Sequence, residues 1–121
     1  MCVFCQIIEK KVSSQIIFEN ENVLAFRDIH PKAPVHALMV TRKHIRSVND
    51  LSVDDEKDVS ALLLAAKEVA KILNVAKGYK LAFNVERAGG QVIEHIHMHL
   101  LAWPNDYTNE EGHIQKEVIM P

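Results

Sequence analysis

The sequence predicts an α+β domain in which an antiparallel β-sheet packs against one long helix. Short runs rich in β-branched and aromatic residues lie within residues 15–41, one long helical pattern starts near residue 52, and strand-like runs follow it. Strands and helices do not alternate as a parallel α/β sheet would require, so we expect antiparallel pairing. A chain of 121 residues with 48% hydrophobic content suits one domain, residues 1–121.

The segment before the helix has the pattern of three strands. Two β-rich runs, residues 15–19 and 23–26, flank the polar turn Asn20-Glu21-Asn22, which is typical of a β-hairpin. Pro31 and Pro34 break the chain into a loop. Residues 35–41 then form an apolar run that predicts another strand, which ends at Arg42-Lys43-His44.

The helical pattern begins at Ser52, a residue type that caps helices, and acidic residues 54–56 follow where the helix dipole favours negative charge. Its predicted apolar stripe contains Val59, Leu62, Leu63, Ala66, Ala70 and Leu73, and is widened by Ala61, Leu64 and Ala65. This width fits either a well-buried helix or a helix that also packs on a second subunit. Asn74 and Gly78 mark its end.

Strand patterns return after the helix. Residues 80–84 predict a strand that leads into the loop of residues 85–91. A last strand is expected from after Val92 to Leu101, where Trp103-Pro104 stops it. The tail from about residue 103 to 121 has no pattern from which a structure can be inferred.

The charge balance argues against polyanionic partners. With 14 Lys and Arg against 16 Asp and Glu, the chain lacks the basic field that binds nucleic acid polymers or anionic membranes. The first residues combine a short apolar run with charged residues, a pattern that matches neither a signal peptide nor a membrane span. We therefore expect a cytoplasmic protein.

Three histidines form the most informative pattern, His95-Ile96-His97-Met98-His99. On a strand, alternate side chains project from one face about 6.6 Å apart, so the three imidazoles would share one surface. That surface fits a catalytic metal held by three histidines, or phosphate chemistry in which a neutral imidazole attacks phosphorus. The preceding Gly89-Gly90-Gln91 favours phosphate chemistry, since backbone N–H groups and an amide suit phosphate oxygens.

Cys2 and Cys5 are the only cysteines, and two thiols cannot form a disulfide framework. Their spacing supplies half of a tetrahedral metal site. A redox pair is the alternative, although the surrounding sequence lacks the βαβ pattern of a thioredoxin-like protein.

These residues resemble the histidine-triad (HIT) superfamily, whose motif alternates three histidines with apolar residues as residues 95–101 do. The resemblance extends, in family order and spacing, over residues 4–8, 25–29, 31–36, 43–45 and 78–91. It is strongest to the histidine-triad nucleotide-binding branch, which hydrolyses purine nucleoside 5′-phosphoramidates to a nucleoside monophosphate and an amine. This resemblance implies a HIT-like fold and a homodimer with the long helix at the shared interface.

The resemblance also assigns roles to individual residues. It implies that His97 attacks the α-phosphorus and forms a nucleotidyl-histidine intermediate, with His99 and His36 around the phosphate. Asp28 would accept hydrogen bonds from ribose hydroxyls, and capping of the loop before Pro31 is its structural alternative. The implied phosphate-side residues are Asn84, Gly90 and Gln91, and the implied base pocket is Phe4, Ile7, Phe26 and Ile29, which also fit an ordinary core.

Bacterial-type members of this branch complete the cysteine pair with two histidines. The matching positions here are His44 and His95, so the resemblance implies a structural zinc held by Cys2, Cys5, His44 and His95. This assignment removes His95 from catalysis.

Two departures from the branch leave the identity of the leaving group open. Val92 stands in place of a hydroxyl residue, and Ala102-Trp103 in place of a glycine pair. A dinucleoside polyphosphate hydrolase that uses the same His97 is therefore an alternative, as is a non-catalytic nucleotide-binding dimer. No role follows for His30 or His113.

Overall fold

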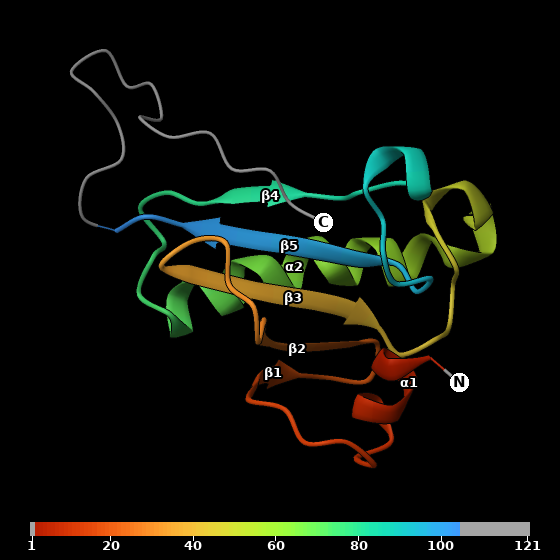
Figure 1. Ribbon diagram of the computed structural model, residues 1–121, viewed down its shortest axis with the longest axis horizontal. Coiled ribbons are helices and arrows are strands. Elements are labelled where there is room, and N and C mark those ends of the chain that lie inside the picture. Colours follow the sequence, from red (N-terminus) through yellow and green to blue (C-terminus); the bar gives the residue numbers. More distant parts are fainter. Residues whose placement is uncertain (1, 105–121) are drawn as a thin grey trace.

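The computed structural model describes residues 2–104, which form one five-stranded antiparallel sheet in the order β1-β2-β3-β5-β4. Figure 1 shows α2 lying behind this sheet, while α1 lies beside β1 and β2. The strands are β1 (Ile16–Glu19), β2 (Val23–Arg27), β3 (Val35–Thr41), β4 (Lys80–Ala82) and β5 (His97–Ala102). The helices are α1 (Val3–Ile8) and α2 (Glu56–Ile72), with 3₁₀ turns η1 (Val48–Asp50), η2 (Val53–Asp55) and η3 (Arg87–Gly89). The predicted α+β class is confirmed, whereas the tail beyond residue 104, with His113, lies outside the described residues.

The N-terminal hairpin and the third strand form where the sequence predicts them. The Asn20 side chain closes the turn between β1 and β2, because its Oδ1 accepts the backbone N–H groups of Asn22 and Val23, both at 2.9 Å. β2 then pairs with β3 along its whole length. β3 spans residues 35–41 as expected, and successive side chains on it point to opposite faces of the sheet.

The two faces of the sheet carry different apolar clusters. The face toward α2 is the main core, where strand residues such as Ala25, Met39 and Leu100 pack with the helix. The opposite face holds a second cluster of Phe4, Ile7, Leu24, Phe26, Leu38 and Val40. Phe4 and Ile7 are three residues apart on α1, so they lie on the same side of that short helix. The second cluster thus covers the sheet face that α2 leaves open.

α2 follows a capping box in which Ser52 Oγ accepts the Asp54 N–H at 3.2 Å and the Asp55 carboxylate accepts the Ser52 N–H at 3.0 Å. The buried residues of α2 repeat at intervals of three and four and are Leu62, Ala65, Ala66, Val69 and Ala70. The predicted stripe is therefore wrong at Leu63, which is 53% exposed. In residues 2–104, no helix has the length and apolar character needed to span a bilayer.

Two further local expectations need correction. β5 begins at His97 rather than after Val92, because residues 93–95 bend and the Ile96 N–H donates to the Ile45 carbonyl at 2.7 Å. His95 therefore precedes the strand. The helix α1 was not expected; its first turn is capped by Cys2 Sγ, which accepts the Cys5 N–H at 3.4 Å.

Candidate active site and metal centre

Three histidines from two adjacent strands gather on the sheet face opposite α2. In the β3–β5 register Leu38 lies opposite His99 and Val40 opposite His97, which places His36, His97 and His99 on the same face. All three side chains are buried. The His97 and His99 ring centroids are 5.1 Å apart, as are those of His36 and His99. The rings thus form a continuous row.

His97 is held as a neutral ring with one nitrogen available. Its Nδ1 lies 2.7 Å from the His95 carbonyl oxygen, and because a carbonyl only accepts, Nδ1 carries the proton. Nε2 then has a free lone pair. Burial lowers the pKa of His97 below its usual value, which keeps the ring neutral near pH 7. A neutral imidazole with a free nitrogen is the form required of a nucleophile.

His36 and His99 form a hydrogen-bond chain whose direction is set by the backbone. The Lys32 N–H donates to His36 Nδ1 at 3.0 Å, so the proton of His36 is on Nε2. This Nε2–H donates to His99 Nδ1 at 2.9 Å, which leaves the proton of His99 on its own Nε2. That Nε2–H is buried and has no hydrogen-bond partner among residues 2–104. A ligand oxygen is the kind of acceptor it lacks.

Electrostatics keep this chain neutral. Burial, and then the neighbouring rings of His97 and His36, lower the pKa of His99 to about 4. Burial also lowers the pKa of His36, although the Asp28 carboxylate opposes that effect. His99 can therefore donate a hydrogen bond from Nε2–H at neutral pH while its ring is uncharged.

Asp28 lies at the end of this chain and uses its two oxygens differently. Oδ1 accepts the His30 N–H at 2.8 Å, which is the loop-capping role expected as its structural alternative. Oδ2 lies 3.5 Å from His36 Nε2. Donor atoms of Asp28, His36 and His99 come within 4.8 Å of one another. A metal there would need the lone pair of His36 Nε2, which carries the proton, so a hydrogen-bond chain fits this cluster better.

The apolar residues expected around the purine base of a nucleotide fall into two groups, one buried and one exposed. Phe4, Ile7 and Phe26 lie together in the second cluster. The Phe4 ring packs edge-on against both Phe26, at a centroid distance of 5.5 Å, and His97, at 5.1 Å. Ile29 is 81% exposed and lies outside this cluster.

The loop before β5 is held together by its own backbone. Gly90 has φ 93°, a conformation that favours glycine, and it ends the 3₁₀ turn η3. The N–H groups of Gly89, Gly90 and Gln91 donate to carbonyls within the loop. Asn84 Nδ2 lies 3.5 Å from the Gly90 carbonyl. In this conformation these glycine N–H groups are therefore used within the loop.

Gln91 supports the loop with its side chain. Its Oε1 accepts the Glu86 N–H at 2.9 Å, and its Nε2 donates to the carbonyls of Arg46 at 2.8 Å and Ile93 at 3.0 Å. The side chain is buried. Both ends of the amide are thus used by protein groups rather than directed at a ligand.

A second group of donors lies where α1 meets the segment after β3. Cys2, Cys5, His44 and His95 each offer a ligand atom, and these atoms all lie within 4.8 Å of one another. Cys2 Sγ and Cys5 Sγ are 3.4 Å and 3.6 Å from His95 Nδ1. Cys5 Sγ is 3.3 Å from His44 Nδ1, which is 3.1 Å from His95 Nδ1. These four residues lie close enough to hold one metal ion.

His95 has the tautomer that a metal ligand requires. His95 Nε2 lies 2.7 Å from the Thr41 carbonyl and so carries the ring proton, which leaves the Nδ1 lone pair directed at the cysteines. Two cysteine thiolates and two neutral imidazoles form a common ligand set of tetrahedral zinc sites. Because His95 Nδ1 belongs to this group, it does not join His97 and His99 in a three-histidine site.

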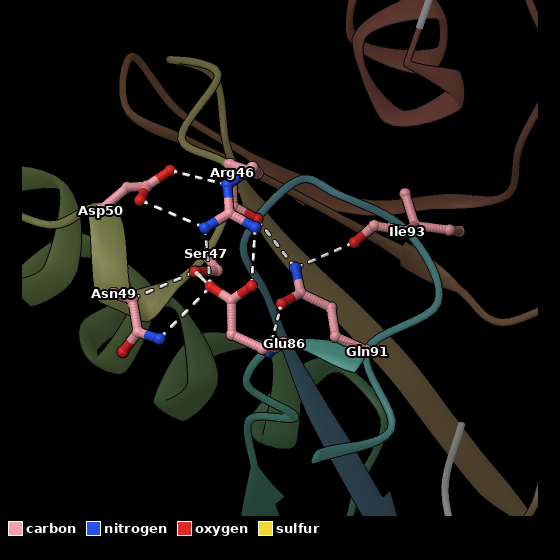
Figure 2. A network of polar contacts seen from close by, with 7 residues as sticks. All are labelled: Arg46, Ser47, Asn49, Asp50, Glu86, Gln91 and Ile93. Carbon is pink, nitrogen blue, oxygen red and sulfur yellow. Dashed lines mark hydrogen bonds and ion pairs between the residues drawn. The ribbon is translucent and has the colours of Figure 1, made fainter. Parts of the chain in front are cut away.

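Sequence reasoning missed a charged network behind the loop. The Glu86 carboxylate accepts hydrogen bonds from Arg46, Ser47 and Asn49, and Figure 2 shows these side chains converging on it. Donation by Arg46 and then Ser47 lowers the pKa of Glu86 to about 2, so Glu86 is ionised at neutral pH. The partners are about 40 positions apart, and no local pattern links them.

Comparison with known proteins gives consistent matches. A family model described as "HIT domain" matches residues 9–105. The chain is 40% identical over 100 residues to the purine nucleoside phosphoramidase of Escherichia coli (strain K12), covering 82% of this chain and 84% of that protein. A HIT family hydrolase from Legionella pneumophila Philadelphia 1 is similar in structure, with TM-score 0.83 and 40% identity over 91% of this chain and 97% of that one. One from Clostridium thermocellum has the same TM-score and identity, over 86% and 91%.

Proposed function

The chain belongs to the HIT domain family, and from that premise we propose that it is an enzyme that hydrolyses the P–N bond of purine nucleoside 5′-phosphoramidates. The E. coli relative is named for this activity. One observation carries the proposal for this chain: His97 donates its Nδ1–H to the His95 carbonyl, which leaves a lone pair on Nε2, beside the His99 Nε2–H that has no partner among residues 2–104. A nucleophile and a hydrogen-bond donor then adjoin on one buried surface.

In the first step, His97 Nε2 attacks the α-phosphorus and the P–N bond breaks. The bonding electron pair leaves on the amine nitrogen, which takes a proton from solvent. The nucleotidyl-imidazolium that forms keeps its Nδ1–H bonded to the His95 carbonyl, which stabilises the positive charge. The His99 Nε2–H donates to a phosphoryl oxygen, where negative charge develops.

In the second step, water attacks the same phosphorus and displaces His97. The products are the nucleoside monophosphate and neutral His97, and the proton taken up in the first step returns to solvent. His36 has a positioning role, because its Nε2–H fixes the tautomer of His99.

The nucleotide is proposed to bind across the second cluster. Phe4, Ile7 and Phe26 offer an apolar surface next to His97, and Ile29 would close over the purine from its exposed position. Asp28 would accept from the ribose hydroxyls. Asn84 and Gly90 are proposed to line the phosphate side, whereas Gln91 supports their loop.

The metal of the four-residue group is proposed to be zinc with a structural role. Zinc would tie α1, which carries Phe4, to the segment of His44 and to the residues just before β5. No step of the reaction passes through it. Two cysteines that act as ligands must stay reduced, which is consistent with the cytoplasm as the proposed location.

A homodimer is the proposed assembly. α2 exposes Leu64 on the side away from its buried stripe and Leu63 and Ile72 on the two flanks of that stripe, and these three are more than half exposed. β4 is an edge strand of the sheet. Within residues 2–104, exposed large apolar residues on a helix and an edge strand with one free side are both features that suit contact with a second copy of the chain.

The proposed function is tested with adenosine 5′-phosphoramidate and, in parallel, diadenosine polyphosphates. Preferred release of AMP and ammonia from the phosphoramidate supports the proposal, whereas preference for the polyphosphates selects the dinucleoside hydrolase. Mass spectrometry of protein quenched during turnover should find a nucleotidyl adduct on His97. A protein that binds AMP but releases no product from either substrate would be the non-catalytic dimer.

A further inference from the structure

The loop before β5 is attached to residues 45–50 through a paired set of charged hydrogen bonds. The Arg46 guanidinium donates to both oxygens of the Glu86 carboxylate, at 2.7 Å each (Figure 2). Asp50 accepts from the same guanidinium at 3.0 Å and 3.3 Å. Two parallel bonds between planar groups fix their relative orientation as well as their separation. The Arg46–Glu86 pair therefore restrains the loop in more than one direction.

Glu86 has a backbone conformation that requires such restraint. Its φ is 63° and its ψ is 170°, a region that residues other than glycine rarely adopt. The Glu86 N–H donates to Gln91 Oε1 at 2.9 Å, and its carbonyl accepts the N–H groups of Gly89 and Gln91 at 3.0 Å each. A strained residue persists only where its surroundings determine its conformation, and such residues concentrate near functional sites.

Residues 45 and 46 also anchor the chain next to the nucleophile through their backbone carbonyls. The Arg46 carbonyl accepts from Gln91 Nε2 at 2.8 Å, and the Ile45 carbonyl accepts from the Ile96 N–H at 2.7 Å. Both ends of the segment from Gln91 to Ile96 are thus bound to residues 45 and 46. The His95 carbonyl, which orients His97 Nδ1, lies within this segment.

We propose that Arg46 and Glu86 are positioning residues for the reaction: their ion pair holds the loop and the following bend so that the His95 carbonyl presents His97 in the tautomer and orientation required for attack. This inference rests on the proposed function, because it describes how the same site is held. Neither side chain touches the reacting atoms.

The test compares the Glu86→Gln and Glu86→Gly variants with the wild type. Gln keeps the shape of the side chain but removes its charge, and Gly removes the side chain while relieving the strained backbone. Glu19→Gln is the matched control, because Glu19, at the end of β1 and away from the loop, forms a similar ion pair with Arg42. Thermal melts establish that each variant is folded.

Two measurements are made on each variant: exchange of the His97 Nδ1 proton, followed by NMR of ¹⁵N-histidine-labelled protein, and kcat and KM with adenosine 5′-phosphoramidate. Both Glu86 variants should exchange this proton faster and lose about 10- to 100-fold in kcat, since misplacement of a reacting group costs this much. Any rise in KM should be smaller than the loss in kcat, because the proposed contacts to the base and the ribose come from α1 and β2 and the residues after it, not from this loop. Glu19→Gln should behave as the wild type.

Three results would count against the proposed role of the Arg46–Glu86 pair. Wild-type exchange and wild-type kcat in a folded Glu86→Gly variant would overturn the proposal, and so would a loss confined to KM. If Glu86→Gln has a reduced kcat and Glu86→Gly has the kcat of the wild type, the effect is due to backbone strain, which would also overturn the proposal. If the wild type does not hydrolyse the substrate, the proposed function fails, and the proton exchange of His97 alone then decides whether the pair positions the ring.

Discussion

Removal of His99 should change how the stability of the protein depends on pH. His99 is buried beside His97 and His36, with Asp28 as the nearby carboxylate, and burial lowers its pKa from 6.5 to about 4. In the unfolded chain the ring takes up a proton below about pH 6.5, whereas in the folded protein it stays neutral down to about pH 4. Between these values the unfolded state binds more protons, so acid favours unfolding.

The size of the effect follows from the two pKa values. Above pH 6.5 His99 is neutral in both states and contributes nothing to the pH dependence. Each pH unit below that costs up to about 1.4 kcal/mol, so at pH 5 the wild type should have lost at most about 2 kcal/mol through this residue. A His99→Gln variant has no ring to protonate, and this part of the acid destabilisation should disappear.

The assay is urea unfolding at several pH values from 8 to 5 for the wild type, His99→Gln and the control His30→Gln. His30 is an exposed histidine near the same site, so its replacement should leave the wild-type pH dependence unchanged. The free energy of unfolding of each variant is compared with that of the wild type at the same pH, so effects common to all three proteins, such as release of metal in acid, cancel. Parallel curves for the wild type and His99→Gln would refute the assignment of His99 as a buried neutral ring.

Four other outcomes are expected. His97→Ala should abolish phosphoramidate turnover in a steady-state assay while AMP binding by calorimetry persists, and retained turnover would contradict the assignment of the nucleophile. Cys5→Ser should lower the zinc content of purified protein by mass spectrometry and lower Tm; an unchanged metal content would rule out this site. Leu62→Ala, in the buried stripe, should reduce the free energy of unfolding by about 2–5 kcal/mol, whereas Val53→Ala, 78% exposed, should change it by less than about 0.5 kcal/mol. Leu64→Glu should convert the proposed dimer to a monomer in sedimentation velocity, and a dimer of unchanged affinity would exclude this face of α2.

Several elements could be predicted because their determinants are local. The Asn20-Glu21-Asn22 turn and the β3 run occur where expected, since turn chemistry and strand periodicity depend on neighbouring residues. Ser52 also caps as predicted, because a capping box spans only four residues, but it starts the 3₁₀ turn η2, and α2 itself begins at Glu56. Leu63 shows the limit of this approach: an apolar residue type does not specify the face on which the helix packs.

The residues of the candidate site were predicted, as was the grouping of Cys2 and Cys5 with His44 and His95, but not how each side chain is held. The alternation of His97 and His99 places both on one face of β5 as expected, but His95 leaves the strand and turns toward Cys2 and Cys5. Its position depends on a hydrogen bond between Ile96 and Ile45, which are far apart in the chain. Gln91 likewise looked like a ligand of phosphate, and only its contacts show that it supports the loop.

By itself, then, the sequence determined the fold class, the strands near the hairpin, the family and the residue types of both sites, because these depend on periodicity, spacing and side-chain chemistry. Only the tertiary structure decided the protonation of His36 and His99, which pair across 63 positions, and the contact of Arg46 with Glu86 across 40. Such contacts form when strand pairing and burial bring distant segments together. Burial also strengthens the hydrogen bonds and keeps the histidine rings neutral.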